Sequence, residues 1–230
     1  PAEGGTPTRR DLRRYEVGLA LSVGELAWHL GPNGDPEGLV WLREELRKLN
    51  VLLRKNGLPE HHEPEVLPEI DRRGAWHSFP YSCTHHLRRA VAYARNAPDE
   101  FATIDREQEP SKDPYIDREL SVRMDCHLIC HDDGSGFYVP IDFPEPLYAD
   151  DVEELAGVIL GSSQRLLAEL IQAAPLLEIQ LDMNGWLSDA EAANLRDEDS
   201  HRYGLERQVW FAFYEAARAS VEYKTVITFG

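Results

Sequence analysis

Leucine recurs at helical spacing in the first quarter of the chain. The clearest stripe advances in steps of three and four residues: Leu39, Leu42, Leu46, Leu49 and Leu53. Asp35-Pro36 suits the start of a helix, because Asp can cap it and Pro fits its first turn, and Asn56-Gly57 suits the end. The pattern predicts a helix between these two signals.

Helical spacing also appears later in the chain, over about 82–96 and 203–223. The stretch from about 11 to 29 fits a helix as well, although its run YEVGLALSV can be read as a strand. Asp151-Val-Glu-Glu154 is a capping-box pattern, which predicts that a further helical stretch starts there.

Period two replaces helical spacing in the middle of the chain. Apolar side chains take alternate positions from Val122 to Cys130, with Ile129 the exception, and again from Phe137 to Phe143. Asp133-Gly134-Ser135-Gly136 lies between the two runs as a turn. The pattern predicts a β-hairpin at about 121–143, and residues 177–181 and 225–229 are also strand-like.

These elements together predict an α+β fold, a helix-rich single domain with a small, partly antiparallel sheet that includes the hairpin. We expect residues 1–10 to form a flexible tail and residues 11–230 to form one globular domain. The polar loop near 98–114 is the place where that domain could divide into two lobes.

Charge is the most unusual property of the sequence. The 230 residues carry a net charge of −17, and residues 121–180 hold eleven acids against Arg123 and Arg165, a net −9. Such a surface repels phosphate, so we expect no nucleic acid and no membrane as partner, and instead a protein with a basic surface. The carboxylates we expect to bind it are Asp125, Asp132, Asp133, Asp150, Asp151, Glu153 and Glu154.

Two features favour a cytoplasmic location. Cys83, Cys126 and Cys130 are too few, and odd in number, for a disulfide framework. No apolar run approaches the roughly 20 residues of a membrane span, and the N-terminus lacks the apolar core of a signal peptide.

The run DCHLICH, residues 125–131, resembles half of a metal site. In a strand, however, positions four apart are separated by about 13 Å, too far for Cys126 and Cys130 to share a zinc ion. The alternation therefore predicts cysteines packed inward and His127 and His131 facing outward. We expect no cofactor, and the residues to suspect if a metal binds are His85, His86, His127 and His131.

A second chemical candidate is Ser82-Cys-Thr-His-His86. Cys83 would lie in the first turn of a helix, where the dipole lowers a thiol pKa, with His85 or His86 as a base. The same cysteine shares an apolar stripe with Leu87, which favours a core position. The chain has no Walker A, GxGxxG, GxSxG or HExxH motif.

The sequence therefore favours a binding protein over an enzyme. The leading hypothesis is an acidic cytoplasmic protein of the inhibitor or immunity type that engages a basic protein partner. The first alternative is a metal- or thiol-dependent enzyme whose site is assembled from dispersed His, Cys and acidic residues, of which Cys83, His85, His86, His127 and His131 are the first to suspect. The second is a helical scaffold, or a homo-oligomer formed through the Leu39–Leu53 stripe.

Overall fold

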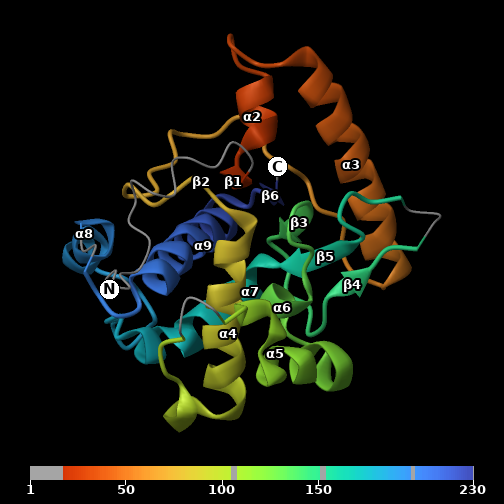
Figure 1. The fold of residues 1–230 in the computed structure, drawn as a ribbon. Helices are drawn as coiled ribbons and strands as arrows, with labels where there is room; N and C mark the ends of the chain where they lie inside the picture. Colours follow the sequence, from red (N-terminus) through yellow and green to blue (C-terminus); the bar gives the residue numbers. More distant parts are fainter. Residues whose placement is uncertain (1–17, 105–107, 151–153, 198–199, 230) are drawn as a thin grey trace.

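A computed structural model describes residues 18–104, 108–150, 154–197 and 200–229. Helices α4, α7 and α9 form the centre of the molecule, and the long helix α3 lies on the other side of a six-stranded sheet (Figure 1). The α-helices are α2 (Glu25–His29), α3 (Pro36–Lys55), α4 (Tyr81–Asn96), α5 (Pro114–Arg118), α6 (His127–Cys130), α7 (Ser163–Ala173), α8 (Asp189–Asp197) and α9 (Gly204–Tyr223).

The sheet has the order β2-β1-β6-β3-β5-β4. Strands β3 and β5 are parallel, and every other pair is antiparallel. Strand β6, the last in chain order, lies inside the sheet between β1 and β3. The strands are β1 (Leu19–Val23), β2 (Ser78–Phe79), β3 (Gly136–Val139), β4 (Leu147–Tyr148), β5 (Ile159–Ser162) and β6 (Ile227–Phe229), and the short helices are η1 (Pro98–Glu100), η2 (Pro110–Lys112), the π-helix η3 (Glu119–Arg123) and η4 (Ala174–Leu177).

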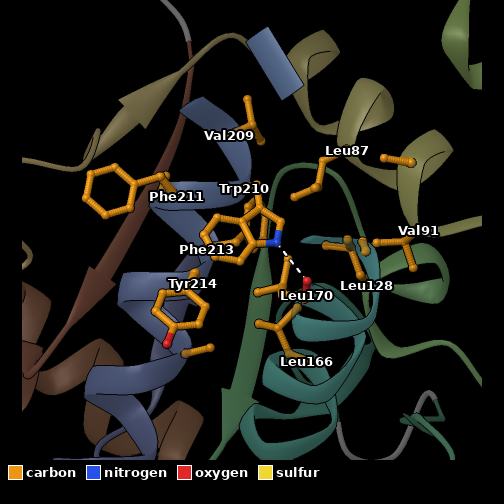
Figure 2. Close-up of a cluster of buried hydrophobic side chains, with 14 of the residues drawn as sticks. Leu87, Val91, Leu128, Leu166, Leu170, Val209, Trp210, Phe211, Phe213 and Tyr214 are labelled. Atoms are coloured by element: carbon orange, nitrogen blue, oxygen red, sulfur yellow. Dashed lines mark hydrogen bonds between the residues drawn. The ribbon is translucent and has the colours of Figure 1, made fainter. Parts of the chain in front are cut away.

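Side chains that alternate along β3 divide the core in two. Tyr138 points into the cluster formed by α4, α7 and α9, whereas Phe137 and Val139 point into the cluster under α3. Figure 2 shows the first cluster, where Trp210 is fully buried and its indole N–H donates to the Leu170 carbonyl at 2.8 Å. The sheet is therefore covered on both faces.

The α+β class, the helix-rich composition and the mixed sheet are confirmed. Asp35 caps α3 by accepting from the backbone N–H groups of Glu37 and Gly38, and helices α4 and α9 occupy the stretches expected for them. The leucine stripe of α3 is packed against the sheet, so it is not available as an oligomerisation seam. In the described ranges no helix is long and apolar enough to span a bilayer.

The hairpin expected at 121–143 is wrong. Residues 119–123 form a π-helix and residues 127–130 form α6, while β3 pairs with β5 and β6 and not with a preceding strand. The Glu169 carboxylate on α7 accepts from the backbone N–H groups of His127 and Leu128 at 2.7 and 2.9 Å, which caps α6. This partner lies about 40 residues further along the chain, so no local pattern could reveal it.

Three other local expectations change. Residues 19–23 are the strand that YEVGLALSV allowed, and α2 begins only at Glu25. Residues 159–162 form β5, so the helix expected from 151 starts at Ser163 instead. Leu181 makes a single bridge to Leu187 instead of a strand at 177–181. The tail expected at 1–10 lies outside the described residues, and the domain count and the lobe division near 98–114 stay predictions.

Candidate functional site

Four of the expected partner-binding carboxylates gather at one edge of the sheet. Strands β3 and β5 are parallel, and β4 is antiparallel to β5. The segments that precede β3 and β5 and the segment that follows β4 therefore lie at the same edge of the sheet. These segments carry Asp132, Asp133, Asp150 and Glu154, which we call the acidic edge. Asp151 and Glu153 lie outside the described residues.

The two aspartates in the loop before β3 are held in place by the fold. Asp132 accepts from the backbone N–H groups of Gly134 and Ser135 at 2.8 and 2.9 Å. Partial burial raises the pKa of this carboxyl, but the two backbone donors outweigh burial and the net pKa is lowered. Asp133 pairs with the buried Arg88 and lies 3.3 Å from His85 Nε2. Asp132 therefore shapes the loop, and Asp133 is neutralised by α4.

The other half of the edge is tied to α3. The Asp150 carboxylate lies 2.7 Å from Lys55 Nζ. The Glu154 carbonyl accepts from Lys48 Nζ at 3.1 Å, whereas its carboxylate makes no ion pair. Glu154 and Val158 have φ of 49° and 63°, a conformation that a β-branched residue such as Val158 rarely adopts, and Val158 is 56 % exposed. The edge therefore combines two carboxylates without an ion pair in the described chain, Asp132 and Glu154, with an exposed, strained apolar residue.

Asp125, the remaining expected carboxylate, does not belong to the acidic edge. It precedes α6 and lies 2.5 Å from Arg95 near the end of α4, where Arg95 also pairs with the buried Glu119. Arg88 and Arg95 are seven residues apart, so they lie about 10 Å apart along the helix axis. Helix α4 therefore neutralises carboxylates at two separate places.

Pairing of this kind extends over the whole molecule. Of the nineteen Lys and Arg residues in the part of the chain that the structure describes, sixteen lie within 4.0 Å of a carboxylate. The surface charge is therefore set by the carboxylates left over. Those on the surface of the described chain without a cationic partner are Glu25, Asp35, Glu37, Glu69, Asp71, Asp99, Glu100, Asp117, Asp132, Glu145, Glu154 and Asp182.

Four of these carboxylates lie around α2, outside the block that the sequence favoured. Glu25 starts α2, Asp35 and Glu37 start α3, and Glu69 lines the same groove as Glu25. We call this group, Glu25, Asp35, Glu37 and Glu69, the α2 surface. Counting charge over residues 1–60 gives a net of zero and hides it, but a shorter window would have found it, because residues 15–42 contain no Lys or Arg.

Cys83 is packed in the core near the start of α4. Only 3 % of it is exposed, and burial raises the pKa of its thiol to about 12. The first turn of the helix therefore does not activate it, and a thiolate does not form there at neutral pH. His85 and His86 point to different carboxylates, Asp133 and Glu206, at 3.3 and 3.4 Å. This arrangement gives no support to a catalytic role.

His127 and His131 are buried, which contradicts the outward orientation expected for them. The backbone N–H of Ser162 donates to His127 Nδ1 at 2.9 Å, and His131 stacks on Tyr138 with ring centroids 4.3 Å apart. Burial lowers the pKa of both imidazoles to about 4. The inward packing expected of Cys126 and Cys130 is confirmed, since both are buried.

The zinc argument from strand geometry does not hold, because Cys126 and Cys130 span a helical turn and not a strand. The structure still separates the four histidines suspected as ligands. Two are tied to carboxylates across α4 and two are enclosed beside the sheet. Within the residues that are described, no three His, Cys, Asp or Glu side chains converge as a metal site.

Comparison with known proteins bears on the partner. A family model with the description "Putative DNA-mimic protein" matches residues 17–229. No curated protein and no solved structure matches the chain. The family description corrects the exclusion of nucleic acid, because carboxylates that repel phosphate can also stand in its place on a protein that binds DNA. The match extends over nearly the whole sequence, and the chain belongs to this family.

Proposed function

We propose that the protein binds a DNA-binding protein on its basic surface and occupies the place of the DNA phosphates there. The observation that carries this proposal is the family match over residues 17–229. The role would be that of an inhibitor or immunity-type protein, acting in the cytoplasm. A basic partner surface is part of the proposal, because DNA-binding proteins contact phosphate mainly through Lys and Arg.

The distribution of charge supports this proposal. Most bases of the described chain are neutralised by carboxylates of the same chain, so the remaining field is negative. A field of one sign speeds the encounter with an oppositely charged surface and weakens as salt increases. This is also how DNA attracts the proteins that bind it.

Displacement by DNA tests the proposal directly. The chain is immobilised, a cell extract is passed over it, and bound proteins are eluted with duplex DNA of mixed sequence at constant salt. We expect the eluate to be enriched in DNA-binding proteins, and binding of the purified protein to weaken between 50 and 300 mM salt, a range over which surface charges become screened. An unrelated acidic protein of equal net charge serves as control.

Two results would overturn the proposal. One is a set of bound proteins that saturating duplex DNA does not release. The other is equal recovery of the same proteins on the acidic control, which would show that net charge alone retains them.

A further inference from the structure

A groove runs between strand β1, helix α2 and residues 67–70. Its volume is about 670 Å³, and Val23, Trp28, Leu67 and Ile70 form much of its apolar wall. The side chains of Leu67 and Ile70 lie over Gly24, whose φ of 74° turns the chain from β1 into α2. The groove is therefore built from two segments that are 39 residues apart in the sequence, counted from Trp28 to Leu67.

Carboxylates and an exposed aromatic ring meet at this groove. Glu25 and Glu69 both line it, and neither makes an ion pair with a residue that the structure describes. Trp28 lines it as well and is 56 % exposed, a large fraction for the residue type most enriched in binding hot spots. An indole face and carboxylates together attract a cation, the first through its π electrons and the second through charge.

Arg72, which lines the groove, is directed into the protein. Arg72 is 5 % exposed, and its guanidinium donates to the carbonyls of Leu21 at 2.8 Å and Ala212 at 3.0 Å. Burial lowers its pKa to about 10, so it stays protonated at neutral pH, but it forms no ion pair with Glu25 or Glu69. Among the residues that the structure describes, no Lys or Arg therefore pairs with either carboxylate.

We propose that this groove receives a lysine or arginine side chain of the DNA-binding partner, with Trp28 against the aliphatic or guanidinium part and Glu25 and Glu69 on the charge. The inference rests on the proposed function and adds a location to it. A second copy of the chain fits less well, because a twofold contact would place Glu25 and Glu69 of one copy against the same carboxylates of the other.

The test compares two double variants of equal charge. Glu25→Gln/Glu69→Gln removes both groove carboxylates, and Asp99→Asn/Glu145→Gln removes two unpaired surface carboxylates away from the groove. The binding probe is the purified protein that duplex DNA released, and the measurement is its Kd at fixed salt. We expect the groove variant to bind about tenfold more weakly and the control to change by less than about threefold.

Trp28→Ala separates the aromatic contribution from the charge. We expect a loss of about tenfold in affinity, as for other exposed aromatic anchors. Thermal unfolding of each variant checks that the fold is kept, and Glu25→Gln/Glu69→Gln keeps the test valid if Trp28→Ala unfolds.

The outcomes separate the groove from the function. Wild-type protein that binds and is displaced by DNA, with equal losses in the two double variants, overturns the groove and leaves the DNA-mimic proposal intact. Wild-type protein that DNA does not displace overturns the proposed function itself. Sedimentation that shows a dimer, abolished by Trp28→Ala, assigns the groove to self-association and also overturns the proposal.

Discussion

The acidic edge and the α2 surface carry four carboxylates each, yet only at the edge do bases of the described chain form ion pairs with any of them, Asp133 and Asp150. Asp133 of the edge pairs with Arg88, 45 residues away, and Asp150 pairs with Lys55, 95 residues away. Glu25, Asp35, Glu37 and Glu69 of the α2 surface make no ion pair in the described part of the molecule. The paired carboxylates of the edge stabilise the fold, whereas those of the α2 surface are the ones that we propose for partner binding.

The difference shows why net charge counted along a sequence does not give the charge of a surface. Residues 121–180 are the most acidic block of the chain, but Asp125, Asp133 and Asp150 all pair with bases from outside it. Residues 1–60 have no net charge, but their bases lie on α3 and in the first fourteen residues, and the α2 surface lies between these two groups. Opposite charges cancel when their side chains are close in space, whatever their separation in the sequence.

The largest effect on stability is expected from a substitution of Arg88, where the acidic edge contacts α4. Arg88 donates to the Leu128 carbonyl at 2.9 Å, to the His131 carbonyl at 2.5 Å and to Asp133. Arg88→Met leaves these acceptors without their donor, so we expect the free energy of unfolding to fall by about 3–5 kcal/mol. Urea unfolding measures it.

The matched control is Arg118→Met, the same substitution at an exposed base without an ion pair in the described chain. We expect it, and Glu25→Gln on the α2 surface, to change stability by no more than about 0.5 kcal/mol. Similar losses at Arg88 and Arg118 would show that the edge is not held by its pairing.

Acid should destabilise the region beneath the edge and leave the α2 surface unaffected. Burial lowers the pKa of His127 and His131 from 6.5 to about 4, so the unfolded chain binds these protons first. Their contribution to stability is complete above pH 6.5 and is lost as the pH falls to 4. Each histidine accounts for up to about 3 kcal/mol.

Glu169 acts in the opposite direction. Burial raises its pKa from 4.5 to about 7, so the folded chain holds this proton more tightly, and its contribution is complete below pH 4.5 and lost as the pH rises to 7. One buried acid therefore offsets one of the two histidines, and we expect a net loss of about 3 kcal/mol between pH 6.5 and 4.

Unfolding curves taken across this range test both signs. Glu169→Gln should steepen the acid loss because it removes the opposing group, and Glu25→Gln/Glu69→Gln should leave the profile unchanged. Stability that is flat from pH 6.5 to 4 in the wild type would contradict the assignment of neutral, buried histidines.

The sequence predicts those elements whose signals are local. The leucine stripe, Asp35 and Gly57 define α3 within a few residues, and α4 and α9 begin and end within one residue of the stretches expected for them. The strand prediction is wrong at residues 126–130, because all five side chains are buried and a hydrophobic period of two then no longer distinguishes a strand from a helix. The helical conformation there is stabilised by the carboxylate of Glu169, a residue on α7.

The sequence predicted the kind of partner but not the position of the surface that we propose. Excess acid indicated a basic protein partner, but the positions chosen for binding followed the densest run of acids, which the bases of α3 and α4 neutralise. The absence of Lys and Arg from residues 15–42, together with Trp28 and Trp41 there, is the feature of the sequence that indicates the α2 surface which we propose.

Asp35 gives the smallest effect and the finest comparison, because it both caps α3 and belongs to the α2 surface. The Glu37 N–H donates to Asp35 Oδ1 at 3.1 Å and the Gly38 N–H to Oδ2 at 3.0 Å, so Asp35→Asn keeps one of the two acceptors and removes the charge. Asp35→Ala removes both. We expect Asp35→Ala to lower the free energy of unfolding by about 1 kcal/mol and Asp35→Asn to leave it within about 0.5 kcal/mol.

Partner binding should depend on the negative charge of Asp35 and not on its role as the cap of α3. Both Asp35 variants should weaken binding of the DNA-displaced protein by the same factor, about two- to threefold for one charge at the rim of an interface. Loss of binding in Asp35→Ala alone would mean that the start of α3 matters through its stability. Equal loss in both, with only Asp35→Ala destabilised, would show that a carboxylate the fold does not neutralise contributes to binding even while it caps a helix.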